Sequence, residues 1–342
     1  MVSSRADMKW HQDLCWNDAF RWQPSRARQP GYREWHHFCI LDEQMDALVN
    51  FSIVDGNEHR PAVGQVMALV RHGRWQGGVE RIPIEDVDIR VGRLQARFGE
   101  SRLDCDGHYY VRVVLRQHGI AVDVRLRPVT EPFVAHNVDP AGGAPLSWLV
   151  VPRLVATGRV TAGTFTRSFE GAPAYHDHNW GRWGTEGVWD WGFGLSVGDD
   201  PECSVVFVRL SDRSRTEVRV QGLFLWDGAS LRRVVRDGDL RFSELGSLVT
   251  DRLCKVPPVL RLLAPGNITG TPGQLEIAYA DRGDCGVARF VSEQAAQVLA
   301  PEDDYPGLLV INEVSAAFEL SGTLGGRQVR CQGRGIFEHV TA

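Results

Sequence analysis

The residues best suited to chemistry form one short run near the middle of the chain, residues 175–181, which reads Tyr-His-Asp-His-Asn-Trp-Gly. In an extended strand, successive side chains point to opposite faces. The run therefore predicts one face with Tyr175, Asp177 and Asn179 and another with His176, His178 and Trp180. Large aromatic rings line ligand pockets as readily as they fill cores, so we expect one of these faces to line a pocket.

Asp177 is the candidate general acid of this run. A carboxyl group walled by aromatic rings is desolvated, and desolvation raises its pKa because it disfavours the charged form. Such a group could hold a proton at neutral pH and donate it to an alkene, while aromatic faces stabilise the developing carbocation. The alternative is that Asp177 accepts hydrogen bonds from Asn179, Tyr175 or backbone amides and only fixes the end of the strand.

His176 and His178 form a His-x-His pair, a spacing found in the metal sites of cupins. The acidic ligand of such a site follows within a few residues, whereas seven residues separate His178 from Glu186. Other histidines would have to complete a site across the fold: His36, His37 or His339. We therefore expect histidines that hydrogen-bond to backbone groups and carboxylates rather than a metal site, and a metal-dependent enzyme is the less favoured alternative. No phosphate-binding loop, dinucleotide fingerprint or nucleophile elbow is present, which favours a reaction without cofactors.

Further aromatic residues are candidates for the wall of a pocket. Trp148 lies in an almost uncharged stretch, residues 146–153, and Trp35 and His37 share one face of the stretch that begins at Glu34. Each of these also has a plain interpretation, as a core residue or as a satisfied residue at the mouth of a barrel. The expected substrate-binding residues are Trp148, His178, Asn179, Trp180, Trp189, Trp191, Trp35 and His37.

Alternation of period two dominates the chain and predicts a mostly β protein. The clearest alternating runs are residues 47–53, 109–115, 120–126 and 204–210. Asp-Gly pairs supply hairpin turns between such runs. The one helical candidate lies around residues 242–263 and is interrupted by Pro257 and Pro258.

The chain also contains an internal repeat. Residues 34–38 resemble residues 188–193, and each stretch precedes an alternating strand. At a constant offset of 162, Tyr175 aligns with Phe337 and Asp177 with His339. Two antiparallel sheets that each close on themselves would remove their edge strands, so the repeat predicts two barrels in tandem.

Composition limits the class of partner and the compartment. Net charge is -5 and acidic and basic residues are mixed along the chain, so the basic surface needed for nucleic acid is not expected. No run approaches the ~20 apolar residues that span a bilayer, and residues 1–12 are too polar for a secretory signal. Seven scattered cysteines without a Cys-x-x-Cys pair predict reduced thiols in the cytoplasm.

The pattern Tyr-x-Asp-x-Asn-x-Gly at residues 175–181, followed by Trp189-x-Trp191, resembles the carotenoid 1,2-hydratase (hydroxyneurosporene synthase) family. The opening at Glu34 and the ending at residues 335–339 resemble it as well. The resemblance implies an all-β chain of two lipocalin-like barrels. Together with the repeat, which sets the boundary between Gly181 and Val188, it predicts an N-terminal extension at 1–29, the first domain at 30–184 and the second at 185–342. It also implies a cofactor-independent reaction on a hydrophobic polyene.

Within that family, the resemblance implies that Asp177 is the proton donor, that Tyr175 and Trp148 are its pocket partners, and that water quenches the cation. One position departs: Leu146 stands where a histidine is expected, which removes a water-orienting base. The His-Asp-His-Asn-Trp-Gly version is also similar to lipocalin-like Diels-Alderases of natural-product pathways. There, Asp177 or His176 would bind a carbonyl while the site holds the polyene in a near-attack conformer.

The expected catalytic residues are thus Asp177, Tyr175 and His176, and the expected partner is a hydrophobic small molecule. A peripheral association of the protein with a membrane, which would give it access to such a substrate, is a further open interpretation. A third interpretation is a carrier that binds an apolar ligand without reacting on it, because a barrel fold does not decide between the two.

Overall fold

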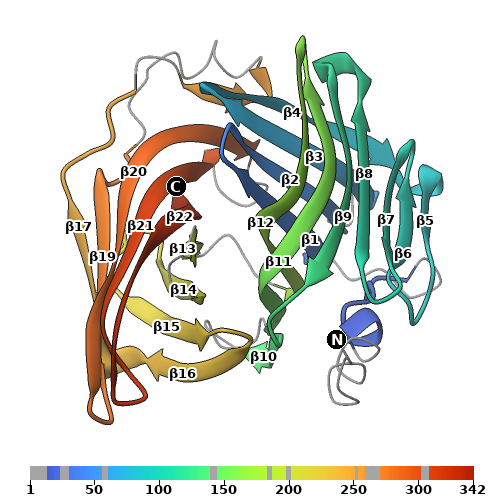
Figure 1. Ribbon diagram of the computed structural model, residues 1–342. Helices are drawn as coiled ribbons and strands as arrows, with labels where there is room; N and C mark the ends of the chain where they lie inside the picture. The colour runs from blue at the N-terminus through green and yellow to red at the C-terminus, as the bar shows by residue number, and fades with distance from the viewer. Residues whose placement is uncertain are drawn as a thin grey trace. The chain divides into compact units, whose positions relative to one another are not determined.

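The computed structural model describes residues 14–23, 31–55, 61–138, 145–182, 187–197, 202–250, 253–258, 270–301 and 308–342 (Figure 1). The chain is all-β, as predicted, and divides into two compact units. The first comprises Met1–His72 and Gly77–Trp183, and the second comprises Gly73–Gln76 and Gly184–Ala342.

The first sheet has twelve strands in the order β4-β3-β2-β1-β12-β11-β9-β8-β7-β6-β5, with β10 paired to β11. Its strands are β1 (Tyr32–Asp42), β2 (Met45–Val54), β3 (Val63–His72), β4 (Arg74–Pro83), β5 (Val87–Ile89), β6 (Gln95–Phe98), β7 (Ser101–Cys105), β8 (Tyr109–Leu115), β9 (Ile120–Pro128), β10 (Phe133–Val138), β11 (Leu146–Ala162) and β12 (Phe165–Arg182). Two 3-10 turns, η1 (Ile84–Asp86) and η2 (Arg116–His118), join strands.

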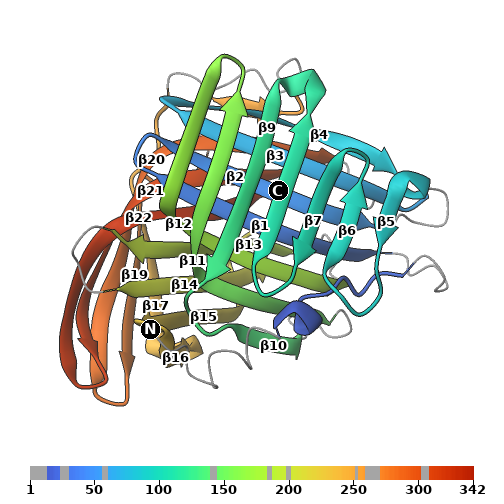
Figure 2. The ribbon, with the colours of Figure 1, turned by 45° about the vertical axis from the view of Figure 1, so that its right-hand side comes forward.

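The alternating runs form these strands because every second side chain can enter one core. In β9, Ile120, Val122 and Val124 are buried, whereas Ala121 and Asp123 between them are exposed. Buried apolar side chains from β1 to β3, β5 to β9, β11 and β12 form a single hydrophobic cluster on one face of the sheet. Figure 2 shows β2 and β3 passing behind β6 to β9, and β3 contacts both β6 and β8. The first sheet therefore curls around its own core.

The second sheet has ten strands in the order β16-β15-β14-β13-β22-β21-β20-β19-β17, and β18 pairs in parallel with β20. Its elements are β13 (Gly187–Ser196), β14 (Cys203–Asp212), β15 (Val218–Asp227), β16 (Ser230–Arg236), η3 (Asp237–Asp239), β17 (Leu240–Leu245), β18 (Cys254–Val256), β19 (Gln274–Asp281), β20 (Asp284–Pro301), β21 (Leu308–Leu324) and β22 (Arg327–Thr341). Contacts of β15 with β17 and of β16 with β19 bring the two ends of the sheet together. This unit has its own core, centred on Phe207, Phe290 and Phe337.

Two expectations from the sequence are wrong. The helical candidate at 242–263 contains the strands β17 and β18 in its described part, because Leu240 to Leu245 pairs with β19. Four of the seven cysteines are not reduced thiols: Cys15 is bonded to Cys105 and Cys203 to Cys331. The bonded cysteines are separated by 90 and by 128 positions in the sequence and meet only in the folded sheets. Sequence spacing alone does not show such pairs.

The segment before β1 belongs to the first core. Residues 14–17 form one helical turn, and the side chains of Leu14 and Phe20 are buried in the cluster of the first unit. The disulfide from Cys15 to Cys105 ties this segment to the end of β7. Residues that the sequence assigned to an N-terminal extension therefore contribute to the barrel interior.

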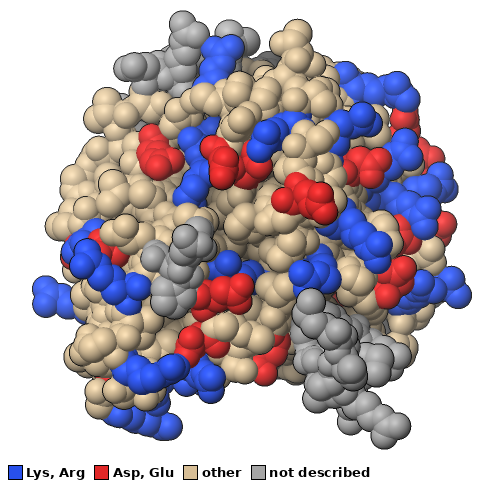
Figure 3. Space-filling view, viewed as in Figure 1, with Lys and Arg blue, Asp and Glu red and all other residues tan. Residues whose placement is uncertain are grey.

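The surface carries charges of both signs. On the face shown in Figure 3, Lys and Arg side chains alternate with Asp and Glu side chains. Exposed ion pairs such as Arg116–Glu100 account for part of this mixing. Among the described residues, no helix has the length and apolarity needed to cross a bilayer.

Candidate functional site

Three neighbouring strands, β1, β12 and β11, position the residues singled out in the sequence. Asp177 on β12 pairs with His37 on β1, and Asn179 pairs with Trp35 on one side and with Trp148 on the other. Directly paired residues of adjacent strands place their side chains on the same face of the sheet. These five side chains and Tyr175 therefore share one face, which we call the acid face.

The acid face is buried although it lies opposite the core of the first unit. Asp177 is 2% exposed, Trp148 3% and Tyr175 1%, and none of the three belongs to the core cluster. Asn179 Nδ2 donates a hydrogen bond to Asp177 Oδ1 at 2.5 Å. The arrangement presents a buried carboxyl group that accepts a hydrogen bond from Asn179, next to large aromatic side chains.

His37 lies across from Asp177 and contributes a neutral ring. Its Nε2 is 3.1 Å from Cys39 Sγ. Burial and the neighbouring His176 lower the pKa of His37 to about 3. The ring that faces Asp177 across the strand pair is therefore an uncharged imidazole at neutral pH.

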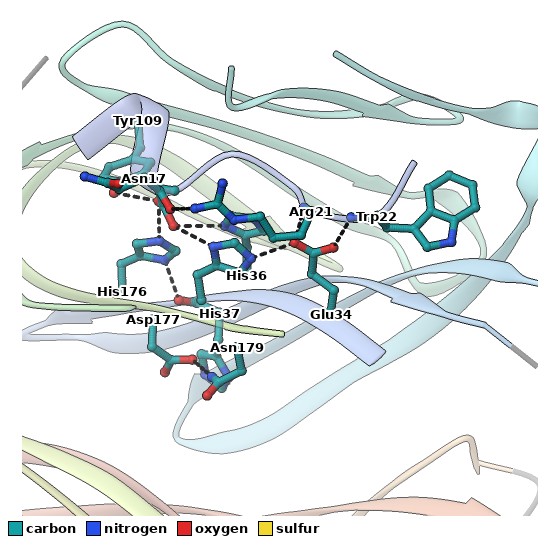
Figure 4. A network of polar contacts seen from close by, with 12 residues as sticks. Asn17, Arg21, Trp22, Glu34, His36, His37, Tyr109, His176, Asp177 and Asn179 are labelled. Atoms are coloured by element: carbon teal, nitrogen blue, oxygen red, sulfur yellow. Dashed lines mark hydrogen bonds and ion pairs between the residues drawn. The ribbon is translucent and has the colours of Figure 1, made fainter. Parts of the chain in front are cut away.

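His176 and His178 point into the core on the other face of β12. The ring of His176 stacks on Phe38, a core residue, with 4.1 Å between ring centroids. Its Nε2 lies 2.8 Å from Asp18 Oδ2, and its Nδ1 lies 2.9 Å from the backbone oxygen of His37. Figure 4 shows Asp177 and Asn179 on one side of the strand pair and His176 on the other.

His178 joins two buried carboxylates. Its Nδ1 is 3.0 Å from Asp18 Oδ1 and its Nε2 is 2.8 Å from Glu34 Oε1. Glu34 also accepts hydrogen bonds from Tyr32 Oη and from the backbone amides of Arg21 and Trp22. Carboxylate oxygens here can only accept, so His178 presents a donor at each ring nitrogen.

The histidines and carboxylates of the core face shift each other's pKa values. Burial acts to raise the pKa of Asp18, but the facing His176 and His36 outweigh it and hold that pKa well below its usual value. Burial acts to lower the pKa of His178, yet hydrogen bonds to Asp18 and Glu34 raise it. For His36, burial and the neighbouring His178 lower the pKa well below its usual value.

Comparison with solved structures finds similar folds over nearly the whole chain. A putative AttH from Nitrosomonas europaea is 12% identical with a TM-score of 0.61, over 94% of this chain and 98% of that chain. CghA with Sch210972 is 14% identical with a TM-score of 0.58, over 94% of this chain and 93% of that chain. Kievitone hydratase from Nectria haematococca is 14% identical with a TM-score of 0.59, over 94% of each chain.

The chain has the tandem lipocalin-like fold of these proteins. No protein-family model and no curated protein matches the sequence. The resemblance inferred from the central motif is thereby confirmed at the level of fold, on structures that share few residues with this chain.

The lipocalin-like units divide the expected site residues into three groups. The acid face of the first unit brings together Tyr175, Asp177, Asn179, Trp148, Trp35 and His37. The core face of the same unit holds His176, His178 and Trp180. Trp189 and Trp191 lie on β13 of the second unit.

The residue that sequence reasoning missed is Asp18. It is fully buried and contacts three side chains that are 91 to 160 positions away: Tyr109, His176 and His178. Its surroundings in the sequence carry no recognisable motif.

The second lipocalin-like unit repeats the acid face with a different carboxylate. Trp191 on β13 pairs with Glu338 on β22, as His37 pairs with Asp177, and Asp190 pairs with His339. The offset of 162 residues aligns His339 with Asp177, and it is therefore one residue too long. Strand register makes Glu338 the equivalent of Asp177, because a shift of one residue moves a side chain to the other face.

Glu338 is partly buried and accepts a hydrogen bond from Trp189 Nε1. Burial raises the pKa of Glu338 to about 7, against the hydrogen bond, which lowers it. On the core face of this unit, Asp190 pairs with Arg209, Arg215 and His339. Burial opposes ionisation of Asp190, but these partners hold its pKa well below the usual value.

Proposed function

We propose that this protein is an enzyme that acts on a hydrophobic polyene of the terpenoid or polyketide type, with Asp177 as the proton donor. The observation that carries the proposal is a carboxyl group 2% exposed among Trp148, Tyr175 and the neutral ring of His37. Desolvation favours the protonated acid, and aromatic faces stabilise a carbocation. Structural likeness to kievitone hydratase and to ligand-bound CghA supports a small organic substrate.

In this mechanism, Asp177 transfers its proton to the less substituted carbon of a terminal double bond, so that a C–H bond forms and a tertiary cation remains on the other carbon. Either water or a second double bond of the substrate then attacks the cation. A proton lost from the product returns to the Asp177 carboxylate, which restores the acid. Asn179, which donates to Oδ1, orients the carboxyl group. His176 makes no contact with the substrate in this scheme, because its ring lies on the core face.

The second candidate is a pericyclase. Leu146, which is half-buried on β11, stands two residues before Trp148, where the resemblance places a water-orienting histidine. A site without that base favours closure of the substrate on itself. Asp177 would then hydrogen-bond a carbonyl and hold the substrate in a reactive conformer. A carrier of an apolar ligand is the third candidate.

The test uses Asp177→Asn with an acyclic carotenoid as the first probe, in solvent deuterium oxide. We expect the native protein to give a product with deuterium bonded to carbon, and the variant to bind the probe, seen as tryptophan quenching, with turnover lowered at least about 100-fold. Native turnover without deuterium in the product would favour the pericyclase. Unchanged turnover in the variant would exclude Asp177 as the acid, and probe returned unchanged by both proteins would favour the carrier.

A further inference from the structure

The core face of β1 and β12 holds a cluster that the proposed acid step does not use. Three imidazole rings converge on one carboxylate, that of Asp18. The nitrogen-to-oxygen distances are 2.8 Å for His176 Nε2, 3.0 Å for His178 Nδ1 and 3.7 Å for His36 Nδ1. All four side chains are fully buried, at 0% exposure.

Hydrogen bonds account for two of the three histidines but not for His36. Among the described residues, neither ring nitrogen of His36 has a hydrogen-bond partner. A buried polar group left in this state destabilises the fold. His36 nevertheless aims its ring into the cluster, stacked on His178 with 3.8 Å between centroids. A partner common to all three rings would explain its position.

Charge compensation points the same way. Within the described part of the chain, Asp18 and Glu34 form ion pairs with histidines only. The buried Asp190 of the second unit instead has two guanidinium groups, those of Arg209 and Arg215. Two buried carboxylates without a lysine or arginine partner need two positive charges for balance. His178 with a proton on each ring nitrogen supplies one of them, and a bound cation would supply the whole.

We propose that Asp18, His36, His176 and His178 bind one divalent transition-metal ion of the zinc class. Three imidazole nitrogens and one carboxylate oxygen make a donor set that suits such ions. The charges of Asp18 and Glu34 together balance the ion. On binding, the ion replaces the protons that His176 Nε2 and His178 Nδ1 otherwise direct at Asp18, and these protons leave to solvent. The proton on His178 Nε2 stays between that ring and Glu34, and His36 gains the partner that it lacks.

The surrounding contacts are those that orient metal ligands. The Nδ1 of His176 faces the backbone oxygen of His37 at 2.9 Å, and the Nε2 of His178 faces Glu34 at 2.8 Å. Tyr109 Oη donates to Asp18 Oδ2 at 2.8 Å. Each of these ligands thus keeps one atom for a supporting partner and one for the ion.

The site would serve the structure of the first unit. It joins the segment that carries Asp18 to β1 and β12 from the core side, and it lies on the opposite face of β12 from Asp177. The proposal is independent of the acid step, since it concerns binding and not turnover.

The test is a Co²⁺ titration of the full chain after treatment with a chelator, followed by displacement with Zn²⁺. We expect one equivalent of Co²⁺ per chain, with visible absorption bands of a low-symmetry site with imidazole nitrogen ligands, release of protons, and a higher unfolding temperature. His36→Phe keeps a ring of similar shape and should lower the affinity by more than the 10- to 100-fold typical of outer contacts. Glu34→Gln should lower it by about 10- to 100-fold.

His37→Gln is the matched control. His37 follows His36 in β1 and lies on the opposite face of the sheet, so this substitution should leave Co²⁺ binding unchanged. Circular dichroism checks that each variant is folded. The proposal is overturned if the native chain shows no saturable binding of either ion. It is also overturned if folded His36→Phe binds Co²⁺ as tightly as the native chain, or if His37→Gln lowers binding as much as His36→Phe.

Discussion

At the scale of residues, successive side chains of β12 point to opposite faces of the sheet, so the residues of one motif lie in two different environments. Asp177 and His176 are adjacent in the sequence, yet Asp177 lies on the acid face and His176 in the core. Acid chemistry is therefore assigned to Asp177, and the histidines are assigned to a buried ionic cluster. The same alternation places Glu338 of the second unit on the face that corresponds to that of Asp177.

Glu338→Gln tests the protonation of this second carboxyl group. The pKa of Glu338 is raised to about 7 in the folded protein from 4.5. Between these values the folded chain holds a proton that the unfolded chain has lost, so its contribution to stability falls as the pH rises through this range. Glutamine does not titrate. Relative to the native protein, we expect the variant to gain about 2–3 kcal/mol in free energy of unfolding between about pH 5 and about pH 8.

Urea unfolding at the two pH values measures this difference. Glu319→Gln is the matched variant: Glu319 is an ion-paired glutamate of the same unit, and it measures the effect of the same substitution outside the acid face. A Glu338→Gln difference that does not change with pH would show that Glu338 is ionised throughout.

At the scale of elements, the segment 14–23 is part of the first barrel. The Cys15–Cys105 disulfide holds it, and Asp18 fills a position between Tyr109 and the histidines of β12. The pairing of β1 with β12 therefore has support on its core side from a segment that is not a strand. Loss of this support would also disturb the strands that carry the acid face.

Asp18→Asn should lower the free energy of unfolding by about 3–5 kcal/mol, because it removes one partner of a buried ionic cluster and leaves the imidazoles uncompensated. Chemical denaturation at neutral pH measures the loss. Asp104→Asn is the control, since Asp104 pairs with an exposed arginine and should contribute less than about 1 kcal/mol. Equal effects of the two substitutions would contradict the central place given to Asp18.

At the scale of the whole molecule, each unit has its own core and its own disulfide. Disulfides persist in oxidising compartments and are rare in the cytoplasm. The cytoplasmic location expected from the sequence stays a prediction, and the state of the cysteines bears on it directly.

Thiol labelling of the denatured, unreduced chain tests this state. We expect three residues to react, Cys39, Cys254 and Cys285, and all seven cysteines to react after reduction. Mass spectrometry counts the labels and locates them. Seven labels without reduction would show that the disulfides do not form in the protein as purified.

The sequence by itself determined the strands and the division of residues 175–181 between two faces. Both depend on the two-residue repeat of an extended chain, which is a local property. It also indicated a repeated, tandem barrel, because the Trp35 and Trp189 strands resemble each other. Only the tertiary structure decided which face enters the core, that Asp18 meets His176 and His178, and that Glu338 corresponds to Asp177. These depend on strand register and on packing between residues distant in sequence, and the period of a strand is the same whichever face is buried.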